Sequence, residues 1–259
     1  MTIKAFQKKI YDHYEAEKRP LPWRTTRDPY KILVSELMLQ QTGSARVMPK
    51  YAEFLKKFPS VSLLAAASVK DVLSVWQGLG YNRRALNLHK AARIIVDHYK
   101  GKFPKERYEL LRLPGLGPYT ASALVAFAYN EPVSMIETNI RTVFIYFFFP
   151  GKKKVSDASL MPFIEKYNDH KNPREWYNAL MDYGAMLKKT FPNPSRTSAH
   201  YAKQSAFEGS LRQVRGAIIK AYIQNNKITK RTLFSILPYT KDKIESQYNK
   251  LKAEGFFAS

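Results

Sequence analysis

The segment LPGLGPYTASA, residues 113–123, constrains the fold more than any other part of the chain. Gly115 and Gly117 flank one apolar residue, so the backbone is able to turn tightly through positive φ angles without a Cβ clash. The run from Thr120 then reads as the first turn of a helix, whose free N–H groups point back at the turn. Such a turn is suited to hold an anion.

The charge of the chain indicates which anion this is. Lysine and arginine number 43 against 21 aspartates and glutamates, a formal net charge of +22. Such an excess repels itself unless a polyanion neutralises it, which favours nucleic acid as the partner and a DNA phosphate at the turn. A solubility surface or a ribosome-bound protein is the alternative. No basic amphipathic helix stands out, so we expect no membrane partner.

The chain contains no cysteine, which excludes disulfides, thiolate zinc sites, iron–sulfur clusters and cysteine nucleophiles. The five histidines lack metal-ligand spacing, so we expect no metal. The N-terminus reads as a charged amphipathic helix and not as a secretion signal. The most apolar run, 143–149, is too short to span a bilayer, which takes about 20 residues. We therefore expect an intracellular protein of the cytoplasm or nucleoid.

Helical periodicity dominates the chain. Ser68 and Asp71 form a capping box, and apolar residues then recur on one helix face. Alternating strand patterns are scarce, which predicts an all-α fold. After about residue 208 three short helical patterns precede Gly255, where Phe256 and Phe257 suggest a hairpin. Residues 208–259 are therefore interpreted as a small winged-helix-like module, for DNA binding or as structural padding.

Four separated motifs carry a family resemblance: LPWRTTRDPYKILVSELMLQQT (21–42), GLGYNRRALNLHKAA (78–92), LPGLGPYTASA (113–123) and WYNALMDYGAM (176–186). Together they resemble the adenine DNA glycosylase (MutY) branch of the helix-hairpin-helix DNA glycosylases, in the family's order. The first two motifs are specific to that branch, whereas the hairpin is shared by the superfamily.

The resemblance implies two helical lobes with a cleft between them. Residues 24–131 would form the hairpin-bearing lobe, residues 1–23 and 132–207 the second lobe, and residues 208–259 the winged-helix-like module. The family's four cluster cysteines fall on Lys188, Ser195, Ser198 and Gln204, so no iron–sulfur cluster is expected. An alkali ion at the hairpin is the ion that the resemblance suggests. The family's long C-terminal domain, which reads 8-oxoguanine, has no counterpart here.

Glu36, within SELMLQQT, is the proton donor that the resemblance implies. Excision of adenine requires the leaving base to be neutralised by an acid as the C1′–N9 bond breaks. A carboxylic acid does this near neutral pH only if burial raises its pKa, and the apolar neighbours of Glu36 would bury it. By pattern alone, an exposed helix glutamate is an equal alternative; the motif favours catalysis.

Glu137 departs from the family, which has an aspartate at this position. That acid stabilises the oxocarbenium-like sugar cation after the base leaves. Glutamate moves the carboxylate by about 1 Å, and a misplacement of that size costs up to about 10²-fold in rate. A repacked site, a slow enzyme and a protein that only binds all remain open. An acid that merely complements a helix N-terminus is the alternative.

Other site residues are also implied by position. Tyr119 stands where strand-cleaving relatives carry a Schiff-base lysine, so little or no lyase activity is expected. Gln41 and Tyr81 match residues that wedge into the duplex. Asn178, where the family usually has glutamine or glutamate, belongs to the pocket for the flipped base. The full predicted pocket is Arg19, Trp23, Leu39 and Asn178, and the predicted DNA contacts are Gly115, Gly117, Thr120, Asn139 and Arg141.

The resemblance predicts a monofunctional base-excision glycosylase that acts as a monomer on double-stranded DNA. Its substrate would be adenine mispaired with 8-oxoguanine or guanine. Removal of thymine or uracil mispaired with guanine is a second hypothesis. A damage-binding protein, in which Glu137 marks lost chemistry, is the third.

Overall fold

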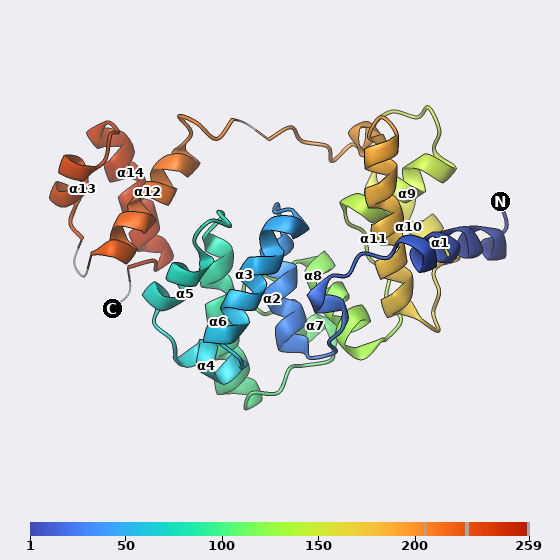
Figure 1. Cartoon of the computed structure of the whole chain (residues 1–259), viewed down its shortest axis with the longest axis horizontal. Coiled ribbons are helices and arrows are strands. Elements are labelled where there is room, and N and C mark those ends of the chain that lie inside the picture. The colour runs from blue at the N-terminus through green and yellow to red at the C-terminus, as the bar shows by residue number, and fades with distance from the viewer. Residues whose placement is uncertain (205, 226–227, 258–259) are drawn as a thin grey trace. The chain divides into compact units, whose positions relative to one another are not determined.

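The computed structural model describes residues 1–204, 206–225 and 228–257, and confirms the all-α prediction (Figure 1). Within these residues the β pairing is limited to one parallel bridge, between Val155 and Ser198. None of the helices in the described ranges is both long and apolar enough to cross a bilayer.

Packing divides the chain into two units, which are described separately. The first consists of Met1–Ile32, Pro104–Arg112 and Leu116–Lys203, and the second of Leu33–Phe103, Leu113–Gly115 and Gln204–Ser259. This division differs from the predicted lobes, because most of residues 104–131 packs with the N-terminal segment. The C-terminal residues likewise pack with residues 33–103. The functional domain boundaries stay a prediction.

The first unit is built around an aromatic core. Its helices are α1 (Ile3–Glu17), η1 (Pro22–Arg24), α7 (Arg107–Leu110), α8 (Pro118–Leu124), η2 (Val125–Tyr129), α9 (Thr138–Phe148), α10 (Asp157–Tyr167), α11 (Pro173–Thr190) and η3 (Pro194–Thr197). Helices α1, α9, α10 and α11 lie side by side (Figure 1). The Phe6 ring lies 5.1–5.8 Å from those of Phe144, Tyr167 and Trp176. The apolar run 143–149 is therefore the buried body of α9.

Helix α11 approaches the first turn of α9 at a glycine. A Cβ atom on Gly184 would lie 2.3 Å from the carbonyl oxygen of Asn139. Real Cβ atoms do not approach backbone this closely, so any other residue would push the two helices apart. This contact sets the distance between α11 and the residues at the start of α9.

The second unit contains α2 (Pro29–Leu39) from Leu33 onward, α3 (Ser44–Lys57), α4 (Val61–Ala66), α5 (Val69–Trp76), α6 (Arg83–Tyr99), α12 (Leu211–Gln224), α13 (Lys230–Ile236) and α14 (Lys241–Glu254). The predicted capping box is confirmed, since the Ser68 hydroxyl accepts from the Asp71 backbone nitrogen at 3.0 Å. Helices α12–α14 form the C-terminal module, and α12 contacts α5. Gly255, at φ +90°, caps α14, and the hairpin expected there is absent from residues 228–257.

Candidate functional site

The hairpin turn differs from its prediction at one of its two glycines. Gly115 has φ +84°, and a Cβ there would lie 2.7 Å from the Cβ of Asn87, so this position requires glycine. Gly117 has φ −85° and is the N-cap of α8, so the predicted positive φ is wrong there. Helix α8 begins at Pro118, which places Tyr119 and Thr120 in its first turn. Tyr119 is half-buried, and Thr120 is 2% exposed.

The carboxyl group of Glu36 is buried in an apolar helix, as expected. Glu36 is 6% exposed on α2, and its neighbours Val34, Leu37 and Met38 are fully buried. Leu39, at the end of the same helix, is half-buried. Burying an ionised carboxylate among apolar side chains is costly, so the protonated acid is favoured at such a place. Glu36 therefore has the surroundings that a proton donor requires.

Arg84 is an important residue that the sequence analysis did not identify. Its guanidinium is buried, and burial lowers its pKa to about 10. The side chain ties the end of α2 to the turn before α6. It donates to the carbonyl oxygens of Leu37 (3.0 Å), Met38 (2.8 Å), Gln40, Leu79 (3.1 Å), Gly80 (2.9 Å) and Tyr81 (3.4 Å), and to the Thr42 hydroxyl (3.1 Å).

The two turns that Arg84 joins carry the predicted wedge residues. Gln41 has φ +58° and Tyr81 has φ +47°. Residues other than glycine rarely adopt such angles, and they do so at some cost in free energy. Both side chains are exposed, Tyr81 to 40%. Strained, exposed residues on a rigid support are typical of positions that contact a ligand.

Glu137 is the N-cap of α9. Its Oε1 accepts from the backbone nitrogens of Asn139 at 2.6 Å and Ile140 at 2.9 Å, and its Oε2 accepts from the Asn139 side-chain amide at 3.2 Å. The longer glutamate side chain thus folds back onto the helix, in the role that aspartate usually fills. The carboxylate is oriented by these bonds and half-buried.

Lys188 extends the site in a way that sequence reasoning missed. It lies on α11 one turn after Gly184, where α11 meets the start of α9. Burial lowers the pKa of Lys188, the negative charge of Glu137 raises it, and the charge of Arg19 lowers it, with a net decrease. The half-buried amine is therefore an electrostatic neighbour of the Glu137 carboxylate.

Asp182 joins two arginines beside the predicted base pocket. Arg19 Nε binds one carboxylate oxygen at 2.5 Å, and the Arg24 guanidinium binds both oxygens at 2.7 Å. Burial raises the pKa of Asp182, but hydrogen bonds and charge from Arg24, and then Arg19, outweigh it and lower the pKa. Arg24 also donates to the Asn178 carbonyl at 3.3 Å. Trp23 is 8% exposed and Asn178 7%.

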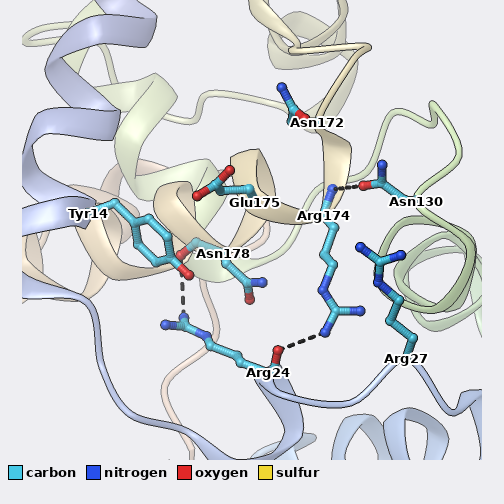
Figure 2. Close-up of a pocket in the computed structure, with 8 residues that line it drawn as sticks. All are labelled: Tyr14, Arg24, Arg27, Asn130, Asn172, Arg174, Glu175 and Asn178. Carbon is cyan, nitrogen blue, oxygen red and sulfur yellow. Dashed lines mark hydrogen bonds between the residues drawn. The ribbon is translucent and has the colours of Figure 1, made fainter.

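A pocket of about 270 Å³ opens in the first unit (Figure 2). Its lining is Tyr14, Arg24, Arg27, Asn130, Asn172, Arg174, Glu175 and Asn178. The structure therefore brings Asn178, but not Arg19 or Trp23, to this pocket. The Arg174 guanidinium donates to the carbonyls of Arg24 at 2.7 Å and Thr26 at 2.6 Å. Three arginines against one glutamate suit an anionic or hydrogen-bond-accepting ligand.

Arg141, a predicted DNA contact, is occupied within the protein. Its guanidinium forms a two-fold ion pair with Asp157, with both nitrogen–oxygen distances at 2.7 Å. The Arg141 backbone nitrogen also bonds the Glu137 carbonyl at 2.8 Å. Arg141 thus joins the starts of α9 and α10. Its role at DNA stays a prediction.

The loop that follows α11 closes through hydrogen bonds. Ser195 and Ser198, at two of the family's cysteine positions, are buried; the Ser195 hydroxyl donates to Asn193 at 2.7 Å, and the Ser198 hydroxyl accepts from the His200 nitrogen at 3.1 Å. Val155 bridges the loop through its backbone, at 3.0 and 2.9 Å. Hydroxyl groups committed in this way do not fit an iron–sulfur cluster, which requires thiolates.

Comparison with known proteins identifies the family. Residues 34–165 match the model of the HhH-GPD superfamily of base excision DNA repair proteins. The chain therefore belongs to this superfamily.

Curated relatives narrow the resemblance to one branch. The chain is 34% identical over 189 residues to the adenine DNA glycosylase of Buchnera aphidicola subsp. Baizongia pistaciae, covering 72% of this chain and 54% of the relative. It is 44% identical over 131 residues to that of Mycobacterium tuberculosis, covering 50% and 43%. The chain thus spans about half the length of the curated relatives it matches.

Solved structures support the fold. The structure of a thermostable thymine-DNA glycosylase matches with a TM-score of 0.64 at 28% identity, over 71% of this chain and 86% of that one. An endonuclease III–DNA complex matches with a TM-score of 0.57 at 18% identity, over 87% and 100%, which shows the fold alone. The predicted helix-hairpin-helix fold is confirmed.

Proposed function

We propose that this protein is a monofunctional DNA glycosylase that removes adenine mispaired with 8-oxoguanine or guanine. The observation that carries the proposal is the buried acid Glu36, 6% exposed, within the motif SELMLQQT. The similarity to adenine DNA glycosylases of several organisms supports adenine as the base. The substrate is double-stranded DNA, and the protein acts as a monomer.

The chemistry follows from the two carboxyl groups. Glu36 donates a proton to a ring nitrogen of the flipped adenine while the C1′–N9 bond breaks and its electron pair leaves with the base. The Glu137 carboxylate stabilises the positive charge that develops on the sugar. Water then adds to C1′ and loses a proton, which gives free adenine and an abasic site. Tyr119 offers no amine, so no imine forms and the strand stays intact.

A panel of duplexes tests this function. Excision is measured under single-turnover conditions on A·8-oxoguanine, A·G, T·G and U·G pairs, and alkali reveals the abasic sites. Adenine release from the first two pairs alone supports the proposal. Release of thymine or uracil instead would make the protein a guanine-mismatch glycosylase, the class suggested by its likeness to a thymine-DNA glycosylase. Tight binding without any product would identify a damage-binding protein. Strand cleavage before alkali would contradict the monofunctional assignment.

Replacement of Glu137 with aspartate is expected to preserve excision or raise it by up to about 100-fold. Aspartate restores the family's side-chain length and is itself a good N-cap for α9. Single-turnover rates measure the effect, with Glu137→Gln as the control that keeps the length of the side chain and removes its charge. A lower rate for Glu137→Asp would mean that the surroundings, Lys188 included, are built around glutamate.

The affinity for DNA is expected to fall steeply with salt. The net charge of +22 implies many lysine and arginine contacts to phosphates, each of which releases counterions. Six to ten such contacts would lower the affinity by about 10³- to 10⁵-fold between 50 and 200 mM salt. Fluorescence anisotropy on an undamaged duplex measures this slope. A flat profile would contradict DNA binding through the basic surface.

A further inference from the structure

The side chain of Tyr81 is held by residues from the far end of the chain. Arg212, on α12, donates from Nη1 to the Tyr81 hydroxyl at 2.9 Å, and Gln204 donates to the same oxygen. The other Arg212 terminal nitrogen donates to the Ala206 carbonyl at 3.4 Å, so the guanidinium is itself oriented. Tyr81 nevertheless stays 40% exposed. It is held without being buried.

Two guanidinium groups also pack over the Tyr81 ring. The central carbon of Arg84 lies 5.6 Å from the ring centroid and that of Arg212 lies 5.8 Å from it. Both distances are within the range of cation–π attraction. Arg84 comes from the same turn as Tyr81, whereas Arg212 comes from the C-terminal module. One wedge side chain is thus oriented by two elements distant in sequence.

The C-terminal module is fastened next to this turn. Glu254, at the end of α14, binds Arg215 of α12 at 2.8 Å and Arg83, two residues after Tyr81, also at 2.8 Å. Lys90 of α6 donates to the Glu254 carbonyl at 3.3 Å. Burial raises the pKa of Glu254, but hydrogen bonds from Arg215 and Arg83 outweigh it and lower the pKa. The module is therefore attached where Arg212 meets Tyr81.

We propose that the C-terminal module braces Tyr81, with Arg212 as the positioning residue that fixes the direction of the wedge. The inference rests on the proposed function, in which Tyr81 enters the gap left by the extruded nucleotide. A side chain on a turn at φ +47° has no regular element to direct it. Ordering it before binding removes that entropic cost from the DNA complex, which strengthens binding to the damaged site.

A double-mutant cycle tests the brace. The variants are Arg212→Met, Tyr81→Phe and their combination, and the control is Lys220→Met, which removes an exposed charge from the same helix. The measurement compares the Kd for a duplex carrying a tetrahydrofuran abasic analogue with that for the undamaged duplex, at fixed salt. Thermal unfolding verifies that each variant is folded.

We expect Arg212→Met and Tyr81→Phe each to lower the preference for the abasic duplex by about 5- to 10-fold, and the double variant to lose little more. Arg212→Lys, which keeps the charge, should recover part of the loss. Lys220→Met should weaken binding to both duplexes equally and add to Tyr81→Phe. Additive effects of Arg212 and Tyr81 would overturn the brace. A stronger abasic preference in Arg212→Met would also overturn it, since the contact would then be inhibitory.

This readout separates the brace from the proposed activity. Neither duplex in the cycle contains a base that must be excised. Failure of excision on every mismatch would overturn the proposed function, while coupling between Arg212 and Tyr81 would still be measured on the abasic duplex. Excision without coupling would have the opposite meaning.

Discussion

The Glu36→Gln variant is expected to lose about 10²- to 10⁴-fold in single-turnover excision, the contribution of a general acid. Glutamine keeps the shape of the side chain but has no acidic proton, so the departing adenine would leave as an anion. Binding of the mismatched duplex should change little, because the side chain is 6% exposed and contributes little surface. The free energy of unfolding should stay the same or rise, because a buried ionisable group becomes neutral.

The matched control for Glu36 is Glu53→Gln, an exposed glutamate on α3 that pairs with Lys50. It should keep the wild-type excision rate and duplex affinity. Quench-flow or gel measurements with enzyme in excess report the chemical step alone. A Glu36→Gln protein with the wild-type rate would remove Glu36 from the mechanism. Equal losses in both variants would indicate a general effect of charge.

Arg84→Met should lower the free energy of unfolding by about 3–5 kcal/mol, the largest stability effect we expect from the site residues. Methionine fills part of the space but donates no hydrogen bond, so carbonyl groups at the end of α2 and in the turn before α6 lose their partner. Leaving such acceptors buried is more costly than any single hydrogen bond is stabilising. In a chain of this size the melting temperature should fall by about 10 °C.

Arg93→Met is the control, since Arg93 is exposed on the same helix and should change stability by less than about 0.5 kcal/mol. Arg84→Lys should be intermediate, because lysine keeps the charge but not the planar fork. Urea unfolding followed by circular dichroism measures all three variants. If Arg84→Met were as stable as Arg93→Met, the carbonyl contacts would be replaceable by water, and Arg84 would not support the turns.

The helical class, the burial of Glu36 and the positive φ of Gly115 followed from local pattern, because each depends on neighbours in sequence. Arg84 was missed although a signal exists. It precedes Leu88 and Ala92 at helical spacing, so the apolar stripe of α6 places it on the buried face. A buried arginine at such a position must bind several acceptors, but the sequence alone does not indicate which carbonyls they are.

Other features depended on contacts between distant segments. The pairing of Arg141 with Asp157 and the approach of Lys188 to Glu137 join different helices, and no spacing rule reports them. The lobe boundaries were misjudged for the same reason, since residues 104–112 pack with the N-terminal segment only through tertiary contacts. The assignments of catalytic and DNA-binding roles stay predictions.

The loop closed by Asn193, Ser198 and Val155 has a consequence for how the protein matures. Its closure is encoded in main-chain and hydroxyl groups that neither iron starvation nor peroxide alters. No assembly factor has to deliver an inorganic centre before this segment reaches its final form. A cell short of iron, or under oxidative attack, would therefore obtain this segment fully formed directly from the ribosome, when oxidised bases are most abundant.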